Sequence, residues 1–451
     1  MSKLMKSVSG IRGIVGDSLT TELVLSFAKR FGVFSKRGKV VVGRDSRTTG
    51  KMMLSSVSAG LMSVGVDVID LGICPTPTIL LAAENLKADG GIAITASHNP
   101  QEWNALKLIN KTGTFLTPVQ SQNFWNIPED ELKDLDWQRV GTYSLYKNAI
   151  DDHIQAIMKL PIIASDKTKE RNFKVVIDST NGAGGLMSPL LLKALGCEVI
   201  ELYSEPNGMF SRIAEPAAEN LCALEEEVKK HGADIGFATD PDVDRLSIVS
   251  DEGKALGTEY TLLLSEKYVL SQKKGNIATN LSSSMASDVI AKENGVEIFR
   301  SRVGEINVAG AMKEHNCVIG GEGNGGVILP DLHFTRDAPL GMALILSYMA
   351  ISGKKISELA AEIPKYYIYK TKLDITVDTD FEEVSNNIIN DFSDKKLDTQ
   401  DGIKIIAPEF WIHIRKSGTE PIVRIIAESS SEKESKKLCE QIIKKYFVSY
   451  F

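Results

Sequence analysis

Three segments of the chain repeat one order of local patterns, and this repeat constrains the fold more than any other feature of the sequence. In each segment a short apolar run is followed by a helical stretch, a glycine and a second apolar run. The segments are 39–71, 174–202 and 276–299, and their glycines are Gly65, Gly196 and Gly295. Glycine supplies the left-handed backbone that ends many helices, and strand, helix and strand in this order are typical of a βαβ unit in a parallel sheet. The repeat therefore predicts three similar α/β domains in tandem.

The last quarter of the chain has a different pattern. Strand-like runs are expected at 372–377, 402–406, 410–414 and 422–428, with helices at 381–392 and 432–447. Strands and helices without strict alternation favour a small α+β domain. The predicted fold is three similar α/β domains with mixed, largely parallel sheets, followed by a C-terminal α+β domain. The expected boundaries are 1–150, 151–252, 253–366 and 367–451, which suit the length of 451 residues.

The composition is that of a globular protein and disfavours several classes of function. The chain has 52 Lys and Arg against 59 Asp and Glu, a net charge of −7, so we expect no binding to nucleic acid or to an anionic membrane. Any attraction for an anionic substrate must come from local cations. The first ten residues lack the apolar core of a secretory signal, and the five Cys are scattered and odd in number. We expect a cytoplasmic protein without disulfides or thiolate-bound zinc.

The motif T-A-S-H-N-P at 95–100 follows the apolar run 91–95. A serine at the end of a buried strand lies where α/β sheets expose their reactive groups. Ser97 is therefore a candidate nucleophile or phosphate carrier, with His98 beside it as a hydrogen-bond donor. The alternative is a plain Asn-Pro turn that Ser97 caps. The motif is not a G-x-S-x-G elbow, which disfavours a hydrolase triad.

The motif A-T-D-P-D-V-D-R at 238–245 is the strongest chemical signal in the sequence. Its carboxylates, at Asp240, Asp242 and Asp244, converge on one point if the segment is a loop or a strand. Three hard oxygen ligands without imidazole or thiolate suit Mg²⁺. An EF-hand loop is disfavoured because it needs glycine at its sixth position and glutamate at its twelfth, where this chain has Arg245 and Asp251. A solvated acidic turn is the alternative.

Two later loops carry polar groups among small residues. The glycine-rich run 320–326 allows Glu322 and Asn324 to approach a polyol closely, or else it is a plain hairpin turn. A dinucleotide fingerprint is rejected there because a strand-like run follows instead of a helix. The run R-K-S-G-T-E-P at 415–421, with Arg424 beyond it, offers a guanidinium, two hydroxyls and free N–H groups. These groups are the components of a phosphate-binding loop, and the alternative is a plain polar turn.

Together the four motifs point to phosphoryl transfer on a phosphorylated sugar. In this order, and over essentially the whole chain, they resemble the α-D-phosphohexomutase family. The runs S-G-I-R-G at 9–13 and G-R-D-S-R at 43–47 add to the likeness. The resemblance implies four domains around a central cleft, a phosphoserine enzyme with Mg²⁺, and a sugar 1,6-bisphosphate as intermediate and activator. The implied partner is a phosphorylated hexose or hexosamine, and the expected assembly is a monomer or a homodimer.

The resemblance also implies a role for individual residues. The implied catalytic residues are Ser97, His98, Lys107, Arg12 and Arg245, and the implied ligands of the metal are Ser97, Asp240, Asp242 and Asp244. The implied substrate-binding residues are Arg302, Glu322, Asn324, Arg415, Ser417, Gly418, Thr419 and Arg424. Lys107 is a candidate general acid or base. Thr419 and its neighbours would hold the phosphate that is not reacting.

The preferred sugar is expected to be glucosamine phosphate, because S-G-T-E-P with Arg424 looks more like the phosphoglucosamine mutases of the family. Glucose and mannose phosphates remain alternatives. Asn324 and Gly326 stand where the family usually has Ser and His, and Glu305 stands where Asp is frequent. A Mg²⁺-dependent sugar-phosphate phosphatase and a non-catalytic sugar-phosphate-binding paralogue are the more remote alternatives.

Overall fold

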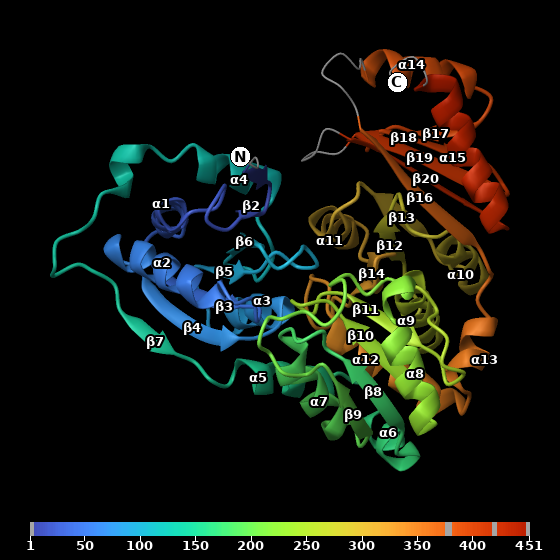
Figure 1. Ribbon diagram of the computed structural model, residues 1–451, viewed down its shortest axis with the longest axis horizontal. Helices are drawn as coiled ribbons and strands as arrows, with labels where there is room; N and C mark the ends of the chain where they lie inside the picture. The colour runs from blue at the N-terminus through green and yellow to red at the C-terminus, as the bar shows by residue number, and fades with distance from the viewer. Residues whose placement is uncertain (1–3, 375–380, 417–421, 448–451) are drawn as a thin grey trace.

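The computed structural model describes residues 4–374, 381–416 and 422–447, and it has one sheet in each of four domains. Figure 1 shows the domains following one another in an arc, from the N-terminal sheet in blue to the C-terminal sheet in red. The predicted fold class is confirmed. The residue boundaries between the domains remain predictions.

The N-terminal sheet has seven strands in the order β1-β2-β6-β5-β3-β4-β7. The strands are β1 (Met5–Ser7), β2 (Gly10–Ile14), β3 (Lys39–Arg44), β4 (Asp67–Ile73), β5 (Gly90–Ile94), β6 (Trp103–Asn110) and β7 (Tyr143–Leu145). The helices are α1 (Thr21–Phe34), α2 (Gly50–Ser63), α3 (Thr76–Asn85) and α4 (Pro118–Trp125), with the 3₁₀ turn η1 (Glu129–Leu132). Along β3, Val40 and Val42 pack with α1 and α2, whereas Val41 packs with α3 on the other face. This alternation follows from the period of two in a strand, and it buries both faces of the sheet.

The second and third domains each have a four-stranded sheet, in the orders β11-β10-β8-β9 and β13-β12-β14-β15. The second contains α5 (Ala149–Met158), α6 (Ser165–Arg171), β8 (Lys174–Asp178), α7 (Gly184–Ala194), β9 (Glu198–Leu202), η2 (Ala218–Asn220), α8 (Cys222–His231), β10 (Ile235–Thr239) and β11 (Leu246–Val249). The third contains α9 (Glu259–Gln272), β12 (Ile277–Asn280), α10 (Ala286–Asn294), β13 (Ile298–Ser301), α11 (Glu305–Glu314), β14 (Ile319–Glu322), β15 (Gly326–Ile328), α12 (Ala338–Ser352) and α13 (Ile356–Ala361). One hydrophobic core spans both domains, with α12 inside it. A shared core holds the two sheets in a fixed relation.

The predicted βαβ units correspond to β3-α2-β4, β8-α7-β9 and β12-α10-β13, and in each unit the two strands are parallel neighbours. The glycines that follow the helices have φ of +89° at Gly65, +81° at Gly196 and +67° at Gly295. These values lie in the left-handed region that ends a helix. The repeat inferred from the sequence is therefore confirmed.

The C-terminal sheet is wholly antiparallel, in the order β16-β20-β19-β18-β17. Its elements are β16 (Tyr367–Asp374), α14 (Phe381–Asp391), β17 (Lys396–Asp398), β18 (Ile403–Ile406), β19 (Phe410–Lys416), β20 (Ile422–Ser429) and α15 (Glu432–Tyr446). Apolar residues of α14 and α15 pack on one face of this sheet. The strand expected at 372–377 begins five residues earlier, at Tyr367, and its residues 375–377 lie outside the described residues; the three-residue strand β17 was not predicted.

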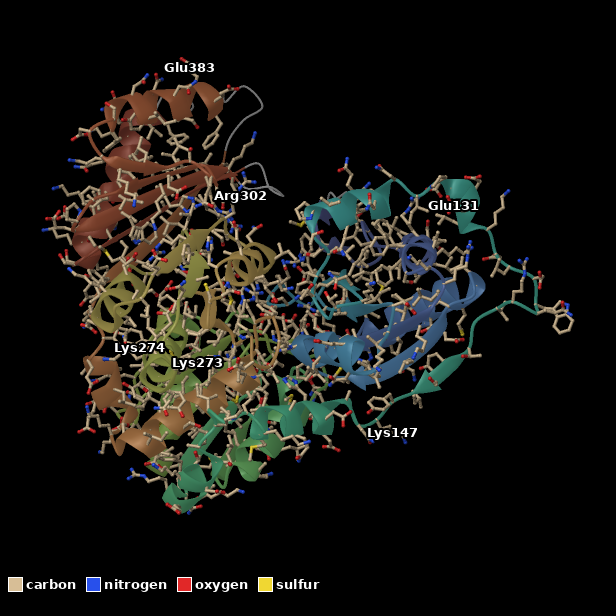
Figure 2. All side chains as sticks on the ribbon, turned by 180° about the vertical axis from the view of Figure 1, so that it is seen from behind. Glu131, Lys147, Lys273, Lys274, Arg302 and Glu383 are labelled. Atoms are coloured by element: carbon tan, nitrogen blue, oxygen red, sulfur yellow. The ribbon has the colours of Figure 1, made fainter. Side chains whose placement is uncertain are left out.

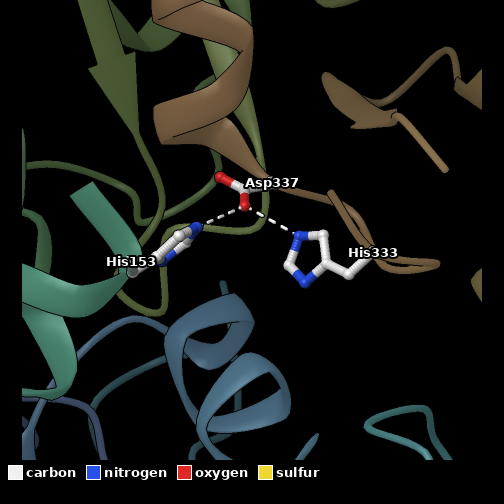
Figure 3. Close-up of side chains that lie close together, drawn as sticks. All are labelled: His153, His333 and Asp337. Carbon is white, nitrogen blue, oxygen red and sulfur yellow. Dashed lines mark hydrogen bonds and ion pairs between the residues drawn. The ribbon is translucent and has the colours of Figure 1, made fainter. Parts of the chain in front are cut away.

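A buried polar cluster joins the first three domains (Figure 3). Asp337, just before α12, accepts hydrogen bonds at Oδ2 from Nε2 of His153 and Nε2 of His333, both at 2.8 Å. His153 also contacts Thr78 of α3 through Nδ1, at 2.9 Å. The second carboxylate oxygen of Asp337 caps α12 by accepting from the N–H of Leu340. The cluster therefore fixes how the first domain sits against the second and third.

Within the described residues, no helix has the length and apolar character needed to cross a membrane.

Candidate active site

Ser97 lies in the loop after β5, with a left-handed backbone at φ +51° and a side chain that is 4% exposed. A non-glycine residue adopts this conformation at a cost, so its surroundings must hold it there. The buried guanidinium of Arg47 does so by donating to four carbonyl oxygens of the loop: Ser97, Asn99, Pro100 and Trp103, at 2.6–3.0 Å. Arg47 is itself paired with Asp45 at 3.0 Å. These contacts hold the loop rigid and fix the position of the Ser97 hydroxyl.

The three aspartates of the second motif line the turn between β10 and β11, and all are at most 1% exposed. One ligand oxygen from each lies within 4.8 Å of the others. The turn includes Val243 at φ +64°, a rare conformation for a β-branched residue. The Ser97 hydroxyl donates to Oδ2 of Asp240 at 2.7 Å. The structure thus brings the serine and the acidic motif together across 143 residues of sequence.

The acid cage, which we define as Asp240, Asp242 and Asp244, has the donor set of a magnesium site. Oδ1 of Asp242 and Oδ1 of Asp244 are buried and have no hydrogen-bond partner among the described residues. Unpartnered buried carboxylate oxygens are costly, and a hard cation satisfies them. The residues present therefore fit a Mg²⁺ ion.

Cationic groups from strands β2 and β6 and from the turn itself face the cage. Lys107 on β6 donates to Oδ2 of Asp242 at 2.6 Å, and Thr76 donates to the same oxygen at 2.8 Å. Arg245 donates its backbone N–H to Asp240 at 3.3 Å and its guanidinium to Glu215 at 2.8 Å. Arg12 on β2 is aligned with Ala105 of β6 and donates to Oδ1 of Asn99 at 2.5 Å. The implied catalytic residues therefore surround one point.

The charge states follow from these contacts. Burial opposes the charge of Lys107, but Asp242 and Asp244 outweigh burial and raise its pKa, so the ammonium keeps its proton. Burial, with the neighbouring Arg245 and Arg12, lowers the pKa of His98 to about 2, so its imidazole is neutral. Nδ1 of His98 lies 3.2 Å from the Ser97 hydroxyl. Burial and the adjacent carboxylates raise the pKa of Asp240.

The glycine-rich loop forms the hairpin between β14 and β15. Both oxygens of Glu322 are engaged: Oε1 accepts from Asn280 at 2.7 Å and from the N–H of Gly304 at 2.9 Å, and Oε2 accepts from Arg336 at 2.7 Å. Asn324 donates to Oε2 of Glu322 at 3.3 Å, and its own Oδ1 is buried without a partner among the described residues. In this state the open acceptor of the loop is therefore Asn324 rather than Glu322.

The remaining predicted substrate residues lie on the third and fourth domains. Arg302 is exposed, and Figure 2 places it near the C-terminal domain, where the N–H of its neighbour Val303 donates to Asp401 at 3.0 Å. Arg415 on β19 pairs with Asp401 at 3.3 Å and is aligned with Arg424 of β20. Ser417, Gly418 and Thr419 lie outside the described residues.

Comparison with known proteins settles the family. Profiles of four successive phosphoglucomutase/phosphomannomutase domains match nearly the whole chain. They are alpha/beta/alpha domain I at 3–133, domain II at 151–253, domain III at 257–367 and the C-terminal domain at 375–445. The chain belongs to the phosphoglucomutase/phosphomannomutase family. The prediction of an isomerase of the phosphohexomutase class is thereby confirmed.

Individual relatives of this phosphohexomutase carry different names. A phosphoglucomutase/phosphomannomutase of Thermococcus kodakarensis is 40% identical over 96% of each chain. A probable phosphoglucosamine mutase of Methanopyrus kandleri is 36% identical, again over 96% of each chain. Among solved structures, a phosphoglucomutase/phosphomannomutase family protein of Burkholderia thailandensis superposes with a TM-score of 0.86 at 26% identity, covering 99% of this chain and 98% of that one.

Sequence reasoning missed several groups that position this phosphohexomutase site. Arg336 contacts both the acid cage and Glu322 of the glycine-rich loop 320–326, Thr76 contacts Asp242, and Asn280 contacts Glu322. The sequence signal for Arg336 is a charged pair, Arg336 and Asp337, directly before a long apolar helix. Thr76 and Asn280 have no local signal, because their partners are distant in the chain.

Proposed function

We propose that this protein interconverts hexosamine or hexose 6-phosphates and 1-phosphates through a phosphorylated Ser97 and a sugar 1,6-bisphosphate. The observation that carries the proposal is the 2.7 Å hydrogen bond from the Ser97 hydroxyl to Asp240, beside two unpartnered carboxylate oxygens. A serine mounted in a strained, rigid loop next to a cation site is suited to carry a phosphoryl group. A plain turn would require neither feature.

The acid cage would hold Mg²⁺ through Asp240, Asp242 and Asp244, with an oxygen of the phosphorylated Ser97 as a further ligand. When bound, the cation would offset charge on the oxygens of the transferring phosphoryl group. This assignment is supported by the all-oxygen donor set and by the two unpartnered oxygens of the cage.

The side chains of the protein would position and protonate the reacting groups. The hydroxyl oxygen of the sugar phosphate would form a bond to phosphorus while the bond from phosphorus to Oγ of Ser97 breaks. Arg12 and Arg245 would face the transferring group, since phosphoryl transfer depends mainly on positioning and charge. Because Lys107 keeps its proton, we assign it to donate that proton to the leaving Oγ of Ser97 and to take up the proton that the sugar hydroxyl loses, so that Lys107 ends the step charged again. Neutral His98 would hydrogen-bond the Ser97 oxygen.

The bisphosphate would then reorient in the site, so that its second phosphate faces Ser97 and the phosphoryl group is transferred back to the serine. Arg415 and Arg424 would hold the phosphate that is not reacting, together with Ser417, Gly418 and Thr419. Arg302, Glu322 and Asn324 would bind the sugar. The open Oδ1 of Asn324 supports this role, because it can accept a hydrogen bond from a sugar hydroxyl.

Glucosamine 6-phosphate and glucosamine 1-phosphate are the proposed substrate pair, with glucose and mannose phosphates as the second candidate. The relatives are compatible with both, since one is named for glucose and mannose phosphates and another as a probable phosphoglucosamine mutase. A panel of the three sugar 6-phosphates, primed with hexose 1,6-bisphosphate, decides between them by kcat/KM. The preference is wrong if the glucosamine phosphate has the lowest value. The cytoplasmic location and the state as monomer or homodimer stay predictions.

Intact-protein mass spectrometry tests the central step. The native protein should carry a phosphate that is absent from Ser97→Ala and present in Ser188→Ala, a matched control that removes a buried hydroxyl of α7. Inorganic phosphate released at the turnover rate, without isomerised sugar, would instead identify a phosphatase. Substrate binding without either product would identify a non-catalytic sugar-phosphate-binding protein.

A further inference from the structure

Arg336 lies between β15 and α12 and connects two sites that the sequence treats as separate. Its guanidinium donates from Nη2 to Oδ2 of Asp244 at 2.6 Å and from Nη1 to Oε2 of Glu322 at 2.7 Å. Its Nε donates to Oε2 of Glu305, the first residue of α11, at 3.2 Å. One buried side chain thus binds the acid cage, the glycine-rich loop 320–326, which we call the sugar loop, and the first residue of α11.

This arrangement needs an arginine. Three carboxylates on three different elements are reached by the three nitrogens of one planar fork, whereas a lysine offers a single point charge. Burial opposes the charge of Arg336, but Asp244, Glu305 and Glu322 outweigh it and raise its pKa well above the ordinary value. The guanidinium is therefore permanently charged and fully committed to these partners.

The sugar loop leaves room for this side chain. A Cβ built on Gly326 would lie 2.1 Å from Cδ and 2.7 Å from Cγ of Arg336, and these atoms are in the middle of a buried side chain. Any residue other than glycine at 326 would therefore push the guanidinium off its partners. The position of the Arg336 guanidinium therefore depends on glycine at position 326, for steric reasons.

We propose that Arg336 is a positioning residue that couples the sugar loop to the acid cage. By holding Oδ2 of Asp244, it leaves Oδ1 of that residue, which accepts no hydrogen bond and lies 3.9 Å from Nε of Arg245, available to a cation. The same guanidinium holds Glu322, so the orientation of the sugar loop and that of the cage depend on one group. Substituting a residue that hydrogen-bonds a metal ligand typically lowers metal affinity by about 10- to 100-fold. The sugar half of this proposal rests on the proposed function, whereas the cation half does not.

Calorimetric titration with Mn²⁺, in the absence of sugar phosphate, tests the part of the proposal that concerns the cation. We expect Arg336→Lys to bind Mn²⁺ about 10- to 100-fold more weakly than the wild type. Arg300→Lys is the matched control, because Arg300 is a half-buried arginine of the same domain that bonds Asp288 and backbone carbonyls. Its Mn²⁺ affinity should be unchanged. An affinity of Arg336→Lys within twofold of the wild type overturns the proposal.

Gly326→Ala keeps the proposal testable if Arg336→Lys does not fold. The added methyl group displaces the guanidinium without removing its charge, and it should weaken Mn²⁺ binding in the same direction. In steady-state assays, both variants should also raise KM for the sugar phosphate. A role in folding alone would lower the thermal midpoint and leave Mn²⁺ affinity and KM unchanged, which would contradict the coupling. If the wild type turns over no sugar phosphate, the proposed function fails while the Mn²⁺ result stands.

Discussion

Glu266 is a buried acid whose removal should stabilise the protein in a pH-dependent way. It lies on α9, it is 0% exposed, and neither of its carboxylate oxygens has a hydrogen-bond partner among the described residues. Burial raises its pKa from 4.5 to about 8, and Ser287 and Arg300 oppose this shift only in part. At neutral pH the side chain is therefore a protonated acid inside the third domain.

The size of the expected stabilisation follows from the pKa of Glu266 in the unfolded chain and its pKa in the folded protein. In the unfolded chain the group ionises above pH 4.5, whereas in the folded protein it keeps its proton until about pH 8. A raised folded pKa means that the contribution to stability is intact below pH 4.5 and is lost as the pH rises towards 8. At pH 7 the loss is about 3 kcal/mol, since each pKa unit corresponds to about 1.4 kcal/mol. Glu266→Gln, which has no charge to lose, removes this slope.

The assay is the difference in thermal midpoint between Glu266→Gln and the wild type at several pH values, because the subtraction cancels all other titrating groups. The difference should be small at pH 5 and should grow to several degrees in favour of the variant at pH 8. Glu293→Gln, at an exposed position of α10, is the control and should show no such trend. A difference that is equal at pH 5 and pH 8 would refute the assignment of a buried neutral acid.

Three further outcomes are expected. Asp242→Asn should lower kcat by orders of magnitude, because it removes one carboxylate of the cage, and it should also lower the midpoint in EDTA, because buried Lys107 loses its ion pair; unchanged turnover with Mg²⁺ would contradict the metal assignment. In metal-free protein the raised pKa of Asp240 makes stability fall as pH rises, so the midpoint gained on adding Mg²⁺ should be larger at pH 8 than at pH 5. Asp337→Asn should cost about 3 kcal/mol in chemical unfolding, because two buried hydrogen bonds to a carboxylate are weakened; a change below about 0.5 kcal/mol would show that the cluster does not hold the domains together.

The sequence predicts those parts of the fold that depend on neighbouring residues. Helical periodicity at 381–392 corresponds to α14, and the expected strand at 410–414 corresponds to β19, because apolar spacing within one element is a local property. The three-residue strands β1, β7 and β17 were not predicted, since so short a segment shows no period. Their pairing is decided by partner strands rather than by their own residues.

The same distinction applies to the site. Asp240, Asp242 and Asp244 were found because their alternate spacing is local, and the serine was found because it ends a buried strand. The partners of these residues were not predictable: Arg336 is 92 positions from Asp244, and Thr76 is 166 positions from Asp242. Such contacts arise only when separate domains pack together. Local motifs therefore reveal the reacting groups, whereas the groups that orient them depend on the tertiary structure.

The charge of the assembled site explains why a cation belongs there. Among the described residues, six carboxylates lie in the cage or pair with its arginines: the three cage aspartates, Glu215 on Arg245, and Glu305 and Glu322 on Arg336. Four cationic side chains face them, from Arg12, Lys107, Arg245 and Arg336. The carboxylates therefore outnumber the cationic side chains, and the raised pKa of Asp240 reflects the crowding of these acids, which a divalent cation would relieve. A phosphate on Ser97 would add about −2 at neutral pH, so the phosphorylated site would be more electronegative than the bare cage. Cation binding should therefore be tighter in the phosphorylated protein than in Ser97→Ala, and Mn²⁺ titration of the two forms measures that difference directly.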